Sequence, residues 1–119
     1  MSKAAISVFA VGVFLILTGT GFFIVPNTVL SLFSIPPTDE VWIRIVGMMV
    51  LFIGYFDVVA ARKELKDFFN ATIHVRLVCF LCFLVLVLTK IAYPILIIFG
   101  IIDLIGAIWT TWALRKEMP

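Results

Sequence analysis

Charged side chains lie inside stretches of sequence that are otherwise apolar, and they are the first candidates for chemistry in this chain. Asp57 and Asp103 are acids in such stretches, and Arg44 and Arg76 are bases. A lone charge at the centre of a bilayer costs about 2.5 to 3.5 kcal/mol on insertion scales, so we expect pairing, neutralisation or contact with water. The depths of these residues predict that Asp57 pairs with Arg76 and that Arg44 extends towards Asp103.

This set of intramembrane charges has two interpretations. In the first, the charges are clamps between helices that fix their packing. In the second, Arg44, Asp57, Arg76 and Asp103 line a route for protons, ions or a polar substrate, because buried membrane charge marks a functional site by default. Thr110 would extend this route, but a threonine also bonds its own helix carbonyls without any route. Both interpretations stay open at the level of sequence.

The chain has one C-x-x-C motif, formed by Cys79 and Cys82, and one histidine, His74. Two cysteines in an apolar helix are usually packed thiols, and no second cysteine pair is present to relay electrons. A single histidine near a membrane boundary has no second ligand with which to hold a metal. No phosphate-binding loop or Ser/His/Asp set occurs either. We therefore predict no metal and no cofactor, and the sequence favours a protein that is not an enzyme.

Composition places the chain in a membrane. Of its 119 residues 64% are hydrophobic and 13% are charged, and the mean hydropathy is +1.25. Too few polar residues are present to cover the surface of a soluble domain of this size. The net charge of +2 comes from scattered bases rather than from a basic stripe, which excludes nucleic acid as a partner. The expected partner is the lipid bilayer.

Four apolar segments are each long enough to cross about 30 Å of hydrocarbon. They predict an all-α membrane protein, a bundle of four transmembrane helices whose neighbours run antiparallel, in a single transmembrane domain over residues 1–119. The first segment is too long for the core of a signal peptide, so we expect it to be retained as an anchor. The predicted helices cover residues 4–25, 41–61, 71–89 and 91–114.

The link between the first two segments predicts a short turn at the membrane surface. Asn27 would cap this turn, its apolar side chains from Val29 to Phe33 would face the membrane, and Pro36-Pro37 would end it. The other two links are shorter: residues 62–69 are charged, and residues 90–94 form a tight break.

Small residues mark the faces that we expect to pack against other helices. In the fourth segment a small, polar face includes Asp103 and Thr110, and the opposite face consists of isoleucines and tryptophans. In a bilayer the bulky face suits lipid and the small face suits neighbouring helices. The predicted packing glycines are Gly47 and Gly54 in the second segment and Gly100 and Gly106 in the fourth.

Basic residues predict the orientation in the membrane. Cytoplasmic ends of membrane proteins carry an excess of Lys and Arg. Only Arg44 and Lys90 fall towards the opposite side, so both termini are expected in the cytoplasm. The seven bases of the cytoplasmic side would be Lys3, Arg62, Lys63, Lys66, Arg76, Arg115 and Lys116.

Several short motifs along the chain resemble those of small bacterial four-helix membrane proteins of the DoxX-like type. They are Val41-Trp42-Ile43-Arg44-Ile45-Val46-Gly47, Gly54-Tyr55, Ala60-Ala61-Arg62, Phe68-Phe69-Asn70-Ala71-Thr72, Arg76, and the run from Phe99 to Ala107. The resemblance implies a compact four-helix bundle in a bacterial inner membrane. DoxX relatives are linked to quinone or thiol redox chemistry, which only Cys79 and Cys82 could supply here.

Three hypotheses for the function follow. The first is a non-enzymatic inner-membrane component, either a homo-oligomer or a partner subunit, in which buried charges clamp the bundle. The second is a small transporter or channel with a polar route past Asp103 and Arg44. The third is a binding or redox protein for a lipid-soluble ligand such as a quinone or an isoprenoid. The absence of a catalytic set in the sequence favours the first.

Overall fold

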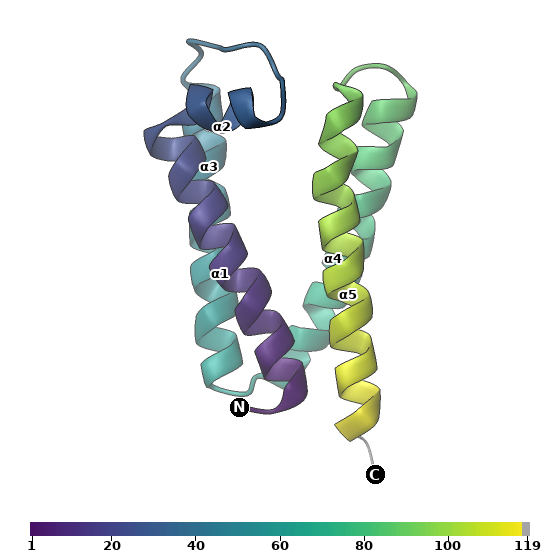
Figure 1. The fold of residues 1–119 in the computed structure, drawn as a ribbon. Coiled ribbons are helices and arrows are strands. Elements are labelled where there is room, and N and C mark those ends of the chain that lie inside the picture. Colours follow the sequence, from purple (N-terminus) through teal and green to yellow (C-terminus); the bar gives the residue numbers. More distant parts are fainter. Residues whose placement is uncertain (118–119) are drawn as a thin grey trace. The chain divides into compact units, whose positions relative to one another are not determined.

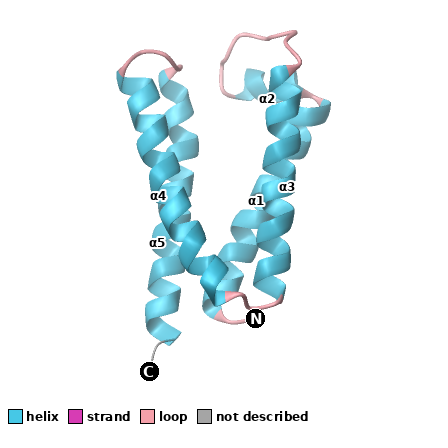
Figure 2. Cartoon of the chain, turned by 180° about the vertical axis from the view of Figure 1, so that it is seen from behind, coloured by secondary structure: helices cyan, strands magenta, loops and turns pink. Residues whose placement is uncertain are grey.

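The structure is a computed structural model, which describes residues 1–117 (Figure 1). The described chain is helical, with short connecting loops and no strand (Figure 2). This confirms the all-α fold class with four long apolar helices. The elements are α1 (Lys3–Ile24), α2 (Pro26–Leu32), α3 (Trp42–Arg62), α4 (Lys66–Leu88), a 3₁₀ turn η1 (Pro94–Leu96) and α5 (Ile97–Glu117).

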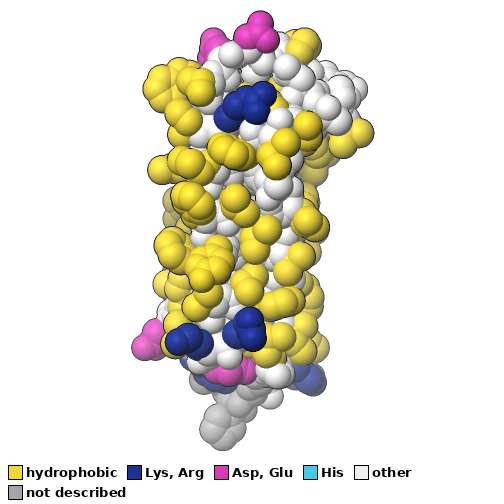
Figure 3. Space-filling model, turned by 90° about the vertical axis from the view of Figure 1, so that its left-hand side faces the viewer, with side chains coloured by type: hydrophobic (Ala, Val, Ile, Leu, Met, Phe, Trp, Pro, Cys, Tyr) yellow, Lys and Arg dark blue, Asp and Glu magenta, His cyan; other side chains and the backbone are white. Residues whose placement is uncertain are grey.

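Four helical segments are long and apolar enough to cross a membrane. They are Lys3–Ile24, Trp42–Arg62, Lys66–Leu88 and Pro94–Lys116. Charged side chains lie mainly at the ends of the helices, and hydrophobic side chains cover their middle parts on the face of the α1 and α3 hairpin that Figure 3 shows. This distribution is typical of an integral membrane protein.

The predicted bounds of the first two long helices are correct to within one residue, and those of the last two need correction. Helix α4 begins at Lys66 rather than at residue 71, because Asp67 in its first turn is favourable at the positive end of the helix dipole. Helix α5 begins at Ile97 rather than at residue 91. Pro94 starts η1 instead, since a proline fits the first position of a helix, where no amide donor is needed.

The turn between α1 and α3 also differs from its prediction. Pro26 is the first residue of α2 and Val25 is its N-cap, so Asn27 does not cap the helix. The Asn27 Oδ1 atom instead accepts a hydrogen bond from the Thr38 amide at 2.9 Å and holds the following loop. Leu30 is buried in the protein, whereas Leu32 is 77% exposed. Only part of the predicted apolar face is therefore available to a membrane surface.

Helices α2, α3 and α4 end in the same way. Each is followed by a non-glycine residue in the left-handed region, and φ is 58° at Ser34, 55° at Glu64 and 62° at Lys90. The next amide donates at 3.0 Å to a carbonyl five residues earlier, from Ile35 to Leu30, from Leu65 to Ala60 and from Ile91 to Leu86. This is the Schellman pattern. Ser34, rather than Pro36-Pro37, thus ends α2.

The chain forms two compact units. One unit comprises residues 9–59, that is, most of α1, α2 and α3. The other comprises residues 1–8 together with the chain from Ala60 onward, which contains α4 and α5. In the second unit α4 and α5 form an antiparallel hairpin (Figures 1 and 2), and Phe69 is its largest fully buried side chain. The prediction of a single domain stays a prediction.

Candidate functional site

Glycines let α1 and α3 approach each other closely. A Cβ atom added to Gly54 would lie 2.6 Å from the Gly12 carbonyl oxygen, and one added to Gly47 would lie 2.7 Å from that of Gly19. Gly12 pairs with Gly54 and Gly19 with Gly47, so the two helices run antiparallel. Backbone packs on backbone at both crossings, as in other membrane helices with small residues at their interface.

Gly47 and Gly54 were predicted from the sequence, whereas their partners on α1 were not. Gly12 and Gly19 have the same seven-residue spacing as Gly47 and Gly54, which places each pair on one face of its helix. This matching spacing was the available signal. A search for equal intervals between small residues in neighbouring segments would have found both pairs.

Asp57 is buried on the glycine face of α3, at 3% exposure. A Cβ atom on Gly12 would lie 3.0 Å from the Cβ atom of Asp57, so the acid packs where α1 has no side chain. The predicted pairing of Asp57 with Arg76 would join residues of the two different units. That pairing therefore stays a prediction.

Arg44 caps the end of α1. Its Nη1 atom donates to the carbonyl oxygens of Phe23 at 2.7 Å and Ile24 at 3.2 Å. The last carbonyls of a helix have no intrahelical donor and carry partial negative charge, so a guanidinium group stabilises them. The predicted approach of Arg44 to Asp103 crosses between units and stays a prediction, but the structure gives Arg44 this other role.

Helix α5 buries its small face and exposes its bulky face, as its pattern predicts. Gly100, Gly106 and Thr110 are buried and Asp103 is half-buried, while the opposite face, formed by Ile101, Ile105, Ile108, Trp109 and Trp112, is exposed. An added Cβ atom on Gly100 would lie 3.0 Å from the Cβ atom of Phe83 on α4. The small face of α5 is therefore a packing face.

A pair of fully buried hydroxyl groups connects α5 to the start of α1. The Oγ atom of Ser7 lies 2.8 Å from the Oγ1 atom of Thr110 and 2.6 Å from the carbonyl oxygen of Ala4. Because a carbonyl only accepts, the single hydroxyl proton of Ser7 goes to Ala4, and Thr110 is the donor to Ser7. This chain of hydrogen bonds runs from Thr110 through Ser7 and ends at the backbone. Ser7 was not among the predicted residues.

Asp103 belongs to a group of polar residues on α4 and α5. The positive charge of Arg76, which is 5% exposed, acts on the Asp103 carboxyl, and both residues act electrostatically on Cys79. Cys79 is half-buried and Cys82 exposed, and both are free thiols. Among residues 1–117 no three His, Cys, Asp or Glu side chains are placed to hold a metal ion. Asp103 and Arg76 thus form the charged centre of this hairpin.

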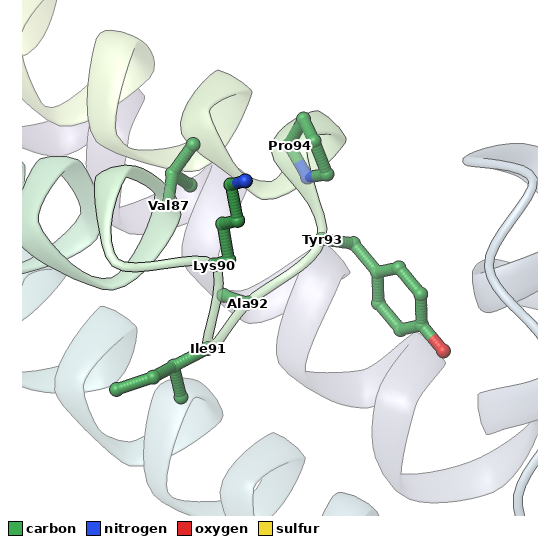
Figure 4. A pocket seen from close by; sticks show the side chains of 6 residues that line it. All are labelled: Val87, Lys90, Ile91, Ala92, Tyr93 and Pro94. Carbon is green, nitrogen blue, oxygen red and sulfur yellow. The ribbon is translucent and has the colours of Figure 1, made fainter.

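A shallow pocket lies at the turn between α4 and α5 (Figure 4). Its lining includes Val87, Lys90, Tyr93 and Pro94. The ring of Tyr93 points away from the side chains of Lys90 and Pro94, so the polar groups do not converge on one point. The convergence of polar groups that marks most ligand sites is therefore missing from this pocket.

No protein-family model, no curated protein and no solved structure matches this chain.

Proposed function

We propose that this chain is a non-enzymatic component of a bacterial inner membrane whose buried polar groups fix the packing of its helices. The hydroxyl chain from Thr110 through Ser7 carries the proposal. A proton route needs exchangeable groups one after another. This series of hydrogen bonds ends at the Ala4 carbonyl, which is already engaged as an acceptor. Thr110, the residue that would extend a polar route, is used for holding α5 to α1.

The glycine contacts between α1 and α3 and the cap that Arg44 places on α1 support the same proposal. Each uses a polar or small residue in the apolar segments to join two elements. The proposal includes both termini in the cytoplasm, assembly as a homo-oligomer or with a membrane partner subunit, and kinship with DoxX-like proteins.

The test separates stability from transport. We expect Thr110→Val and Asp103→Asn to lower the midpoint of unfolding in detergent, while purified wild-type protein in liposomes gives no flux of protons or common ions above empty vesicles. Thr111→Val is the matched control for Thr110→Val, because the Thr111 hydroxyl bonds only the Ala107 carbonyl of its own helix at 2.8 Å. Flux that Asp103→Asn abolishes while stability is unchanged would contradict the proposal.

A second candidate function is transport, which rests on the interaction between Asp103 and Arg76. A half-buried acid that feels the charge of a buried base inside an apolar hairpin is the kind of intramembrane charge that marks ion and proton pathways. In that case the flux assay gives a signal that depends on Asp103 but not on Thr110. The same assay therefore decides between the two functions.

A further inference from the structure

One end of the unit formed by residues 1–8 and 60–117 gathers basic side chains from three places in the sequence. Ser2 contacts Glu64 through both its backbone amide and its hydroxyl group, which places the start of α1 at the turn before α4. The Ser7 to Thr110 bond brings the last turns of α5 to the same end. We call this set the basic end. It comprises Lys3, Arg62, Lys63, Lys66, Arg115 and Lys116.

The acids near the basic end neutralise little of it. Glu64 is half-buried, and each of its carboxylate oxygens accepts a hydrogen bond from Ser2, at 2.5 Å and 2.8 Å. Asp67 is exposed and is the other acid among the described side chains there. All six bases are exposed. The turn therefore directs its acid towards the protein and its bases outward.

The basic end lies at the level where lipid headgroups begin. Lys66 opens one membrane-crossing segment and Lys116 closes another. The Nζ atom of Lys116 lies 5.4 Å from the ring centroid of Trp112, a distance at which the ring attracts the ammonium group. Tryptophan side chains favour the interface between hydrocarbon and headgroups. The bases are thus held where phosphate groups of lipids are concentrated.

We propose that the basic end binds the headgroups of anionic phospholipids. Lys and Arg side chains beside a membrane-crossing helix attract the negative phosphodiester groups of such lipids, which carry a net negative charge. Each base raises the binding constant by about five-fold. The loop of residues 33–41 offers no such surface, because it carries the acids Asp39 and Glu40. The nearby base Arg44 is engaged by carbonyl oxygens. This inference does not depend on whether the protein transports ions.

Tryptophan quenching tests the proposal, because the ring of Trp112 lies next to Lys116 of the basic end. The protein with Trp42→Phe, which keeps Trp109 and Trp112, is reconstituted in phosphatidylcholine vesicles that contain brominated phosphatidylglycerol or brominated phosphatidylcholine. We expect the binding constant of phosphatidylglycerol, divided by that of phosphatidylcholine, to be well above one. This ratio should fall towards one in Arg62→Gln, Lys63→Gln and their double variant, by up to about five-fold per removed charge. The matched control is Lys90→Gln, which removes a base from the other end and should change nothing.

Salt and free phosphate give two further readings. About 0.5 M NaCl should lower the preference, because it shortens the screening length to a few ångströms. Millimolar inorganic phosphate should leave the quenching unchanged; if it abolishes the preference, the site takes phosphate from solution and the lipid proposal is wrong. A wild-type constant of one, or an equal loss in Lys90→Gln, would also overturn it. Since Arg62 and Lys63 are exposed, unchanged helical circular dichroism is expected in every variant.

Discussion

At the scale of single residues, polar groups in this chain mostly bind neighbouring backbone rather than each other. Arg44 caps α1 and Ser7 donates to the Ala4 carbonyl, and Thr89 and Thr111 bond carbonyls of their own helices. In an apolar environment an unsatisfied polar group costs several kcal/mol, and the nearest acceptor is usually a backbone carbonyl. Two contacts between side chains, Thr110 with Ser7 and Glu64 with Ser2, join the start of α1 to the rest of its unit.

The contact between Glu64 and Ser2 makes one residue-scale prediction. Hydrogen bonds from the Ser2 amide and hydroxyl lower the pKa of the Glu64 carboxyl, and the N-terminal amine and Lys66 lower it further. A lowered pKa means that the carboxylate stabilises the fold fully above the unfolded value of about 4.3. This contribution is lost as the pH falls through the lower value of the folded protein.

We therefore expect the unfolding midpoint of the wild type to drop towards that of Glu64→Gln as the pH falls below about 4.3. Above that pH the difference between the two proteins should be constant. Thermal unfolding in detergent, followed by circular dichroism at a series of pH values, measures both curves. Parallel curves over the whole range would show that the contact does not titrate.

At the scale of elements, the helix ends and the glycine contacts decide how the helices meet. Helices α2, α3 and α4 all stop at a residue with positive φ, so their ends are set by local backbone geometry and not by the next proline. Helices α1 and α3 meet where neither has a side chain. Both features fix the geometry of a hairpin.

The glycine contacts predict that Gly47→Ala is strongly destabilising. The new Cβ atom would lie 2.6 Å from the Phe23 amide nitrogen, and a rigid backbone atom cannot move aside without separating the helices. We expect a loss of about 1 to 3 kcal/mol, the usual cost of overpacking. The control is Gly21→Ala, whose Cβ atom would meet one methyl group of Val29 at 2.9 Å. Reversible unfolding in mixed micelles should separate the two variants; equal losses would refute the backbone contact.

The positive φ of Lys90 predicts a stabilising substitution. A non-glycine residue in the left-handed region costs about 1 to 2 kcal/mol, whereas glycine adopts it freely. Lys90→Gly should therefore raise stability by about 1 kcal/mol in the same unfolding assay. Thr89→Gly is the comparison, because Thr89 has a φ of −84° and should lose stability instead. A loss in both variants would mean that the turn is not left-handed at residue 90.

At the scale of the whole molecule, the distribution of bases predicts the topology. With both termini in the cytoplasm, the loop at Asp39 faces outward and the turn at Lys63 faces inward. In a protein with Cys79→Ser and Cys82→Ser, a membrane-impermeant maleimide added to intact cells should label Asp39→Cys. It should label Lys63→Cys only after the membrane is opened. The reverse pattern would invert the orientation and move the basic end to the other leaflet.

The sequence by itself determined the class of the protein and the faces that α3 and α5 bury. Hydrophobic length fixes which segments can span a membrane, and a 3.6-residue period fixes which residues share a face, so the buried small face of α5 follows from spacing alone. Thr110 and Gly47 were found in this way. The starts of α4 and α5 were wrong by five and six residues, because charge and proline near a helix end permit several starting points.

Only the tertiary structure decided which residues meet. Gly12 faces Gly54, Ser7 receives the Thr110 hydrogen bond, and Arg44 reaches the carbonyls of α1. The reason is physical: the period of a helix says which residues point the same way but not how far the neighbouring helix is shifted along its axis. That shift is set by close packing of small residues and by the satisfaction of each buried donor, and both depend on the two helices together.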